Sequence, residues 1–169
     1  IVVANADAST VYNKLIKGNQ AKLRKVRRDL AKAEPSLAGF SLLLGLRPAE
    51  KPTDLSHHNI FFPKDYDQEF VEIFDEKRAV TDPTIYLCAP QDESMVRHNG
   101  HESWFVLVNA PRHDVEGHNG FNWNDGEFNQ RYAMQIIDSL ESRGVQIRER
   151  LEQIDIRTPA DLERSVLAP

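Results

Sequence analysis

Residues 40–46 read Phe-Ser-Leu-Leu-Leu-Gly-Leu, a nearly continuous apolar run that decides the fold class of this 169-residue chain. An apolar run of this length is typical of a β-strand, and its continuity predicts a strand covered on both faces. Two similar runs occur at residues 84–89 (Thr-Ile-Tyr-Leu-Cys-Ala) and 104–109 (Trp-Phe-Val-Leu-Val-Asn), and Pro90 and Pro111 end them. We therefore expect these three runs to form the centre of a sheet.

Strand and helix patterns alternate around these runs. Residues 57–62 predict a further strand closed by Pro63, and residues 145–156 predict one strand or two. Three helices are expected: residues 65–77, with Phe70, Val71, Ile73 and Phe74 buried and acidic residues outside; residues 127–142, ended at Gly144; and residues 159–167, with Thr158 as N-cap and Pro159 in the first turn. The predicted fold class is α+β, with a mixed or antiparallel sheet and flanking helices, over residues 38–157.

The N-terminal part of the chain has a different sequence pattern. Residues 1–4 (Ile-Val-Val-Ala) predict a buried strand that ends at Asn5, and residues 8–18 predict a helix with Ser9 or Thr10 as N-cap. A second helix is expected over about residues 20–34, ended by Pro35. Since the chain opens on Ile1 inside an apolar run and not on Met, we expect it to be part of a longer protein.

Charge is distributed unevenly. The chain has 21 Lys and Arg against 26 Asp and Glu, a formal net charge of -5, which does not favour a general nucleic-acid binder. Residues 14–34 alone carry eight basic and two acidic side chains, +6 against -11 for the rest. Three interpretations of this basic helix remain open: a solvated charged face, attachment to anionic lipid headgroups through its basic and apolar sides, and nucleic-acid binding. Nucleic acid ranks last, because the rest of the chain is acidic and the helix has no interleaved aromatic residues.

Several reactive sites are not predicted. Cys88 is the only cysteine, which excludes an internal disulfide and fits a reducing compartment, and its place in an apolar strand predicts an inert thiol. The chain has no Gly-x-Ser-x-Gly nucleophile motif and no glycine-rich phosphate loop. No apolar run approaches the roughly 20 residues that span a bilayer.

The six histidines do not follow a known metal-ligand spacing. His98 and His101 flank an Asn-Gly turn, with further candidates nearby (Asp92, Glu93, His113, Asp114 and His118), and we predict no metal site among them. His57 and His58 are different, because adjacent residues of a strand point to opposite faces and one must point inward. Two alternatives remain for that residue: lining a pocket as a hydrogen-bonding or proton-transfer group, or a core histidine bonded to a carbonyl.

Read in order, the segments resemble one known family. The stretches that carry the resemblance are Val2–Asp7, the basic helix leading into residues 35–40 (Pro-Ser-Leu-Ala-Gly-Phe), Leu44–Leu46, His57–Phe62 with Asp65 and Tyr66, Glu69–Phe70, Ile73–Phe74, Asp82–Tyr86, Glu102–Val108 with Ala110 and Pro111, Leu140–Glu141, Gly144, Glu149–Arg150 and Thr158–Asp161. Together they are similar to the bacterial phytoene desaturase family, flavin-dependent carotenoid desaturases of the amine-oxidase-like superfamily.

The resemblance implies an organisation and a chemistry. Residues 1–7 would be the end of a strand of a Rossmann-like flavin domain, and residues 8–169 would be a substrate-binding domain that encloses a long polyene. The implied reaction is dehydrogenation of a phytoene-like carotenoid precursor, with hydride transfer to FAD. The family's glycine-rich flavin motifs are absent from this chain, so the chain by itself is expected to be inactive and to need the rest of the flavin domain.

The resemblance and the residue pattern together give the candidate sites. Asn5 and Ala6 are the expected flavin contacts, and the expected substrate-binding residues are His57, His58, Phe61, Phe62, Tyr66 and Tyr86. No catalytic base can be assigned. The protein is expected in the cytoplasm, at the membrane periphery, with a carotenoid substrate and no nucleic acid. The alternatives are a related polyene oxidase, isomerase or saturase, and a non-catalytic module that binds lipid or a partner.

Overall fold

The computed structural model describes residues 1–34, 36–50, 54–90, 94 and 99–167. In these ranges the elements run α1 (Ala8–Thr10), the π-helix η1 (Val11–Leu15), α2 (Ala21–Leu30), β1 (Ala38–Leu46), β2 (His58–Phe61), α3 (Tyr66–Phe70), the π-helix η2 (Val71–Asp75), β3 (Ile85–Cys88), β4 (Glu102–Ala110), α4 (Gly126–Glu141), the 3-10 helix η3 (Arg148–Arg150), β5 (Leu151–Arg157) and α5 (Pro159–Val166). The predicted α+β class is confirmed.

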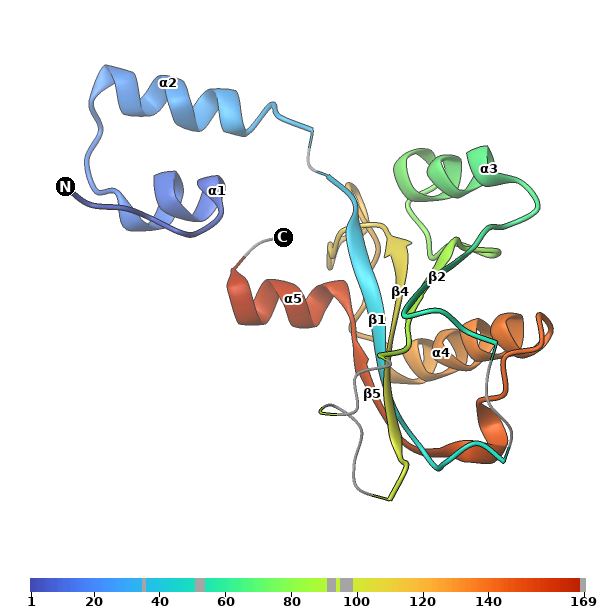
Figure 1. Cartoon of the computed structure of the whole chain (residues 1–169). Coiled ribbons are helices and arrows are strands. Elements are labelled where there is room, and N and C mark those ends of the chain that lie inside the picture. Colours follow the sequence, from blue (N-terminus) through green and yellow to red (C-terminus); the bar gives the residue numbers. More distant parts are fainter. Residues whose placement is uncertain (35, 51–53, 91–93, 95–98, 168–169) are drawn as a thin grey trace.

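The five strands form one sheet in the order β2-β3-β4-β1-β5, and every neighbouring pair is antiparallel. The long pair is β1 with β4, where Phe40 lies opposite Val108 and Leu44 opposite Trp104. On its other side β1 pairs with β5, with a register shift between Gly45 and Leu46. The central strands therefore come from distant parts of the chain (Figure 1).

Side chains of β1 alternate strictly between a buried and an open face. Phe40, Leu42, Leu44 and Leu46 are at most 2% exposed, whereas Leu43 is 43% exposed. The prediction that this strand is covered on both faces is therefore wrong. The apolar residue at 43 does not signal a second core layer, because no helix among the described residues covers it from the other side.

The core lies between the sheet and α4. Asp125 begins this helix by accepting a hydrogen bond from the Phe128 amide at 3.0 Å. The helix buries Tyr132, whose ring centroid lies 5.0 Å from that of Phe40. Trp123 contacts the same Phe40 ring at 5.4 Å. The other helical residues that are buried on this side are Ala133, Ile136, Ile137 and Leu140.

The segment predicted as one helix over residues 65–77 divides into α3 and η2, and its buried side differs from the prediction. Val71 and Phe74 are exposed, whereas the carboxylates of Glu69 and Glu72 are buried. Glu69 is 1% exposed and accepts hydrogen bonds from the Thr84 amide (2.9 Å), the Thr84 hydroxyl (2.6 Å) and the Asn109 side chain (2.9 Å). These donors stabilise the buried charge, which an amphipathic pattern cannot reveal.

The N-terminal segment lies apart from the sheet, beside α5 (Figure 1). Residues 1–5 have no regular secondary structure, and Ile1, Val2 and Val3 are almost fully exposed. The buried strand predicted at 1–4 is therefore wrong, because none of the strands in the described ranges pairs with it. The cap of α1 is Asp7, which accepts from the Ser9 amide at 2.8 Å, and not Ser9 or Thr10.

The basic helix is confirmed but shorter than predicted, since α2 ends at Leu30, before the Pro35 that falls outside the described residues. One of its basic side chains, Arg27, stabilises the fold. The guanidinium of Arg27 donates to the carbonyls of Tyr12 (2.7 Å), Ile16 (2.8 Å) and Gly18 (3.1 Å), which holds the preceding loop against the helix.

The last helix begins as the sequence predicts. Thr158 caps α5 and Asp161 bonds back to Thr158, so both halves of a capping box are present. Burial raises the pKa of Asp161, but hydrogen bonds from the Thr158 amide and hydroxyl and from Arg164 outweigh it, so the pKa lies below its usual value. The carboxylate form is therefore the one that the fold stabilises.

We expect Glu69→Ala to destabilise the fold by about 3 kcal/mol, because it leaves buried donors from Thr84 and Asn109 without an acceptor. Urea unfolding followed by circular dichroism measures the change. Glu127→Ala is the matched control, since Glu127 is exposed, and it should change stability by less than about 0.5 kcal/mol. Equal effects of the two variants would contradict the assigned role of Glu69.

We expect Asp161→Asn to cost about 1 kcal/mol at pH 7 through loss of the capping box. A depressed folded-state pKa contributes stability above the unfolded value of about 3.9, and this contribution disappears as pH falls through the folded pKa. The difference between wild type and variant should therefore shrink below about pH 4. Urea unfolding at pH 7 and pH 3 tests this, with the exposed Asp54→Asn as control. A gap that grew toward acid would contradict the assignment.

Candidate functional site

The open face of the sheet is the candidate functional surface. It is formed by the side chains that alternate with the core residues on β1 to β4, and three of them are large, apolar and exposed: Leu43 (43%), Ile60 (57%) and Phe105 (36%). The register places Leu43 opposite Phe105, and Ile60 opposite Tyr86. The rings of Tyr86 and Phe105 lie 6.3 Å apart in an edge arrangement. An exposed apolar stripe thus crosses four strands; we call Leu43, Ile60, Tyr86 and Phe105 the open-face stripe.

One end of this face is closed by α3 and η2. Thr84 and Asn109 lie on the same side of the sheet as the stripe and bind the buried Glu69. Nearby, Leu107 lies over Gly39, where an added Cβ would come within 2.8 Å of the leucine side chain. Any larger residue at this position would require the terminal methyl of Leu107 to move.

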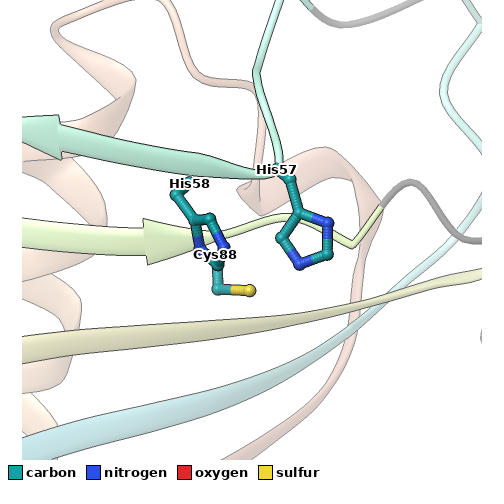
Figure 2. Close-up of side chains that lie close together, drawn as sticks. All are labelled: His57, His58 and Cys88. Carbon is teal, nitrogen blue, oxygen red and sulfur yellow. The ribbon is translucent and has the colours of Figure 1, made fainter.

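A polar group lies at the β2 and β3 edge of the open face. Nδ1 of His58 lies 2.8 Å from the hydroxyl of Tyr86, and the rings of His57 and His58 have centroids 4.4 Å apart. Cys88 is the partner of His58 in the strand register. One ligand atom from each of His57, His58 and Cys88 lies within 4.8 Å of the others, and Figure 2 shows the three side chains together at one end of these strands.

The surroundings of this polar group change the pKa of Tyr86. Desolvation raises the pKa of the Tyr86 hydroxyl above its usual value, and the neighbouring Cys88 thiol raises it further. The phenol is therefore kept protonated at neutral pH and can donate or accept a hydrogen bond. Cys88 itself is only partly buried, so its strand does not enclose it as the sequence suggested.

The prediction that one of the two adjacent histidines points inward is wrong, because both are exposed. His57 precedes the first residue of β2, so strict alternation does not apply to it. Its carbonyl accepts from the Ala89 amide at 2.9 Å, which fixes the backbone while the ring stays outside. Neither histidine is a core residue bonded to a carbonyl.

The structure separates the predicted substrate-binding residues into three groups. His57, His58 and Tyr86 lie at the open face. Phe61 lies on the opposite face, where it packs against the core and the Arg143 guanidinium sits 6.0 Å from its ring. Phe62 and Tyr66 form an exposed edge-to-face pair at the start of α3, 5.8 Å apart, outside the sheet. No single pocket holds all six.

Sequence reasoning missed Leu43, Ile60 and Phe105. A signal was present for Leu43 and Phe105, since each lies between two buried residues of its own strand, and period-two counting from Phe40 or Trp104 assigns it to the opposite face. The face of Ile60 follows only from its pairing with Tyr86. What the pattern could not show is that none of the described helices lies over the stripe.

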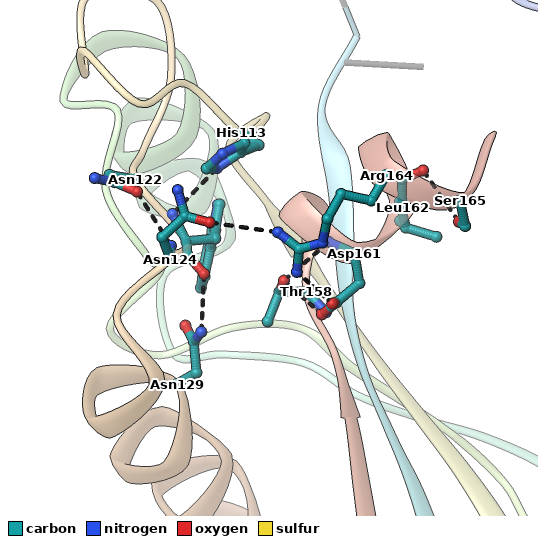
Figure 3. A network of polar contacts seen from close by, with 10 residues as sticks. His113, Asn122, Asn124, Asn129, Thr158, Asp161, Leu162, Arg164 and Ser165 are labelled. Atoms are coloured by element: carbon teal, nitrogen blue, oxygen red, sulfur yellow. Dashed lines mark hydrogen bonds and ion pairs between the residues drawn. The ribbon is translucent and has the colours of Figure 1, made fainter. Parts of the chain in front are cut away.

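A second polar cluster joins the start of α5 to the loop before α4 (Figure 3). The Trp123 amide donates to Nδ1 of His113 at 3.2 Å, and Asn129 donates to the Trp123 carbonyl at 2.9 Å. Arg164 links Asn124 to Asp161. These groups mostly satisfy backbone atoms and caps, which indicates a structural role. His113 is thereby a buried loop residue, whereas His98 lies outside the described residues.

The residues expected to contact flavin do not form a site for it here. Asn5 and Ala6 are exposed and have no helix or strand around them, and the neighbouring Asp7 carboxylate is used as the cap of α1. No described glycine-rich turn cradles an anion beside them. The described residues therefore do not fit FAD, and the flavin contact of Asn5 and Ala6 stays a prediction.

Among the described residues, none of the helices combines the length and the apolar character that crossing a bilayer requires.

Comparison with known proteins identifies relatives over most of the chain. It is 28% identical to a 4,4'-diaponeurosporene oxygenase of Staphylococcus haemolyticus over 166 residues, which are 97% of this chain and 31% of that protein. It is 31% identical to a carotenoid 3,4-desaturase of Haloarcula japonica over 154 residues, 89% of this chain and 28% of that protein. A 1-hydroxycarotenoid 3,4-desaturase of Flavobacterium sp. is 31% identical over 130 residues, 74% of this chain and 23% of that protein.

No protein-family model matches the chain. The chain spans about a third or less of the length of the curated relatives that it matches (31%, 28% and 23%). This chain is a relative of the carotenoid desaturases and diaponeurosporene oxygenases, which confirms the expected relationship to the phytoene desaturase family.

Proposed function

We propose that this chain forms the substrate-binding sheet of an oxidoreductase of carotenoid biosynthesis, a desaturase or an oxygenase. The observation that carries the proposal is the open-face stripe, a row of apolar and aromatic side chains on a sheet whose other face packs against the hydrophobic core. Exposed contiguous apolar surface of this kind marks binding sites. The names of the relatives point to a carotenoid as the ligand.

The geometry of the stripe suits a polyene. It crosses four neighbouring strands, β2-β3-β4-β1, which are about 4.8 Å apart, so it is roughly 14 Å wide. A carotenoid chain is longer than this and flat, so it would lie across the strands and extend beyond them. Dispersion contacts with aromatic and aliphatic side chains would hold it, and the polar group at His58 and Tyr86 would bound the stripe at one edge.

The role of these residues in the reaction is to bind and orient the polyene and to exclude water from it. In the proposal FAD would supply the hydride-accepting chemistry, and Asn5 and Ala6 stay the predicted flavin contacts of this chain. The polar side chains of the open face are candidates for positioning, and we assign no catalytic base to any of them.

A second part of the proposal concerns the membrane, where such apolar substrates reside. The basic helix α2 is exposed along Lys22, Lys25 and Arg28, while Leu23 is buried beneath it. Arg27 is occupied by backbone carbonyls, so it is not available to lipid. We propose that the three exposed cations contact anionic headgroups and hold the protein at the membrane periphery, on its cytoplasmic side.

We expect Phe105→Asp to reduce polyene binding at least tenfold, because it removes an aromatic contact of about 2 kcal/mol and places a charge on the stripe. The measurement is the phytoene extracted from the purified chain after incubation with phytoene-loaded liposomes, quantified by chromatography. Val115→Asp is the matched control, since Val115 is 63% exposed in a loop away from the sheet, and it should bind as wild type does. Equal loss in both variants, or no phytoene on the wild-type chain, would contradict the proposal.

We expect replacement of Lys22, Lys25 and Arg28 by Gln to weaken binding to vesicles containing phosphatidylserine about 100-fold, since each cation contributes about 1 kcal/mol. Vesicle flotation measures the bound fraction. The control replaces three exposed cations of the body, Lys64, Arg131 and Arg157, with Gln. If the two triple variants lost binding equally, net charge and not the helix would be responsible, and the proposed role of α2 would be wrong.

A further inference from the structure

The side chains at the β2 and β3 edge of the open face are of types that bind metal ions, and the polyene proposal gives them no such role. His57, His58 and Cys88 bring two imidazoles and one thiol together, with one ligand atom of each within 4.8 Å of the other two. Imidazole nitrogen and thiolate sulfur are the donors preferred by zinc-class ions. We propose that these three residues bind a zinc ion, independently of the carotenoid function.

Two features of the backbone create this group. Antiparallel pairing of β2 with β3 places His58 directly opposite Cys88, and neighbours in such a pair lie on the same face. His57 lies one residue before the strand, where alternation is not imposed, and its ring comes within 4.4 Å of the His58 ring. The hydrogen bond from Ala89 to the His57 carbonyl holds this residue against β3.

Tyr86 supplies the support that metal-binding histidines usually have. Its hydroxyl lies 2.8 Å from Nδ1 of His58, which leaves Nε2 of the same ring for the ion. An outer hydrogen bond of this kind fixes the tautomer and the orientation of the imidazole. The rings of His58 and Tyr86 are stacked with their centroids 6.0 Å apart, which holds the His58 ring in the same orientation.

The distances allow the site to close. Tetrahedral zinc with Zn–N bonds near 2.0 Å places neighbouring nitrogens about 3.4 Å apart. The present spread of up to 4.8 Å therefore has to contract by about 1 Å or more. His57 is exposed and lies outside β2, so its ring can turn toward His58 and Cys88 without disturbing the core. Three protein ligands leave the fourth position open, as in zinc sites that keep a water or bind a further ligand.

The experiment uses the purified chain, stripped of metal with a chelator and titrated with Zn²⁺ by calorimetry. In parallel, Co²⁺ replaces zinc as a spectroscopic probe, because a thiolate ligand gives cobalt a charge-transfer absorption band. We expect one ion per chain and a thiolate-to-cobalt band in the wild type. Cys88→Ser should abolish the band, and His57→Asn should weaken Zn²⁺ binding at least 100-fold.

The Tyr86→Phe variant distinguishes a residue that orients His58 from a residue that binds the metal ion. It removes the hydroxyl beside His58 but no ligand, so binding should weaken by about 10- to 100-fold while the cobalt band remains. The matched control is His118→Asn, which changes an exposed histidine of the 113–121 loop and should bind Zn²⁺ as wild type does. Circular dichroism establishes that each variant is folded.

A chemical readout keeps the proposal testable if a strand variant fails to fold. Zn²⁺ should slow the alkylation of Cys88 by iodoacetamide in the wild type and in His118→Asn, but not in His57→Asn, whose residue lies outside β2. Absence of the cobalt band in the wild type, or undiminished Zn²⁺ binding and protection in His57→Asn, would overturn the proposed site.

Discussion

The alternation of side chains along β1 is the constraint on which the rest of the structure depends. This strand lies between β4 and β5, and its even-numbered residues Phe40, Leu42, Leu44 and Leu46 all point to the buried face. Because antiparallel partners share a face at each register position, β1 also decides which residues of β4 and β5 are buried. A shift of one residue would place the aliphatic row in solvent and Leu43 in the core. The packed face and the open face therefore follow from one register.

Among the described residues, helices cover the open face at one end only. The buried Glu69 attaches α3 to Thr84, which precedes β3, and to Asn109 of β4. The helix therefore lies over that end, and in the described part of the chain Leu43, Ile60 and Phe105 stay exposed. A buried carboxylate is stable only with its donors in place, which makes this attachment directional as well as strong. The position of one charged side chain thus separates the part of the sheet that is packed from the part available to a ligand.

Much of this could be predicted from the sequence, because it depends on local patterns. The β-branched and aromatic runs predicted the strands, the Thr158 and Pro159 pair predicted the start of α5, and the charge count found the basic helix. Predictions failed where the outcome depended on a distant partner. The run at residues 1–4 has strand propensity, but no described strand pairs with it. Glu69 and Glu72 are buried because donors from the loop before β3 and from Asn109 of β4 reach them. Phe61 faces the core because Ile85 lies opposite it in the register.

The sequence by itself therefore determined the class of the fold, most of its elements and, by resemblance, the family of its relatives, since propensity, periodicity and ordered motifs are properties of neighbouring residues. Only the tertiary structure decided which surface is available for function. Cys88 lies 30 residues after His58 along the chain, and the two histidines and the thiol meet only when β2 pairs with β3. Leu43 and Phe105 become neighbours only when β1 pairs with β4. Long-range strand pairing selects these contacts, and no local pattern contains the register that creates them.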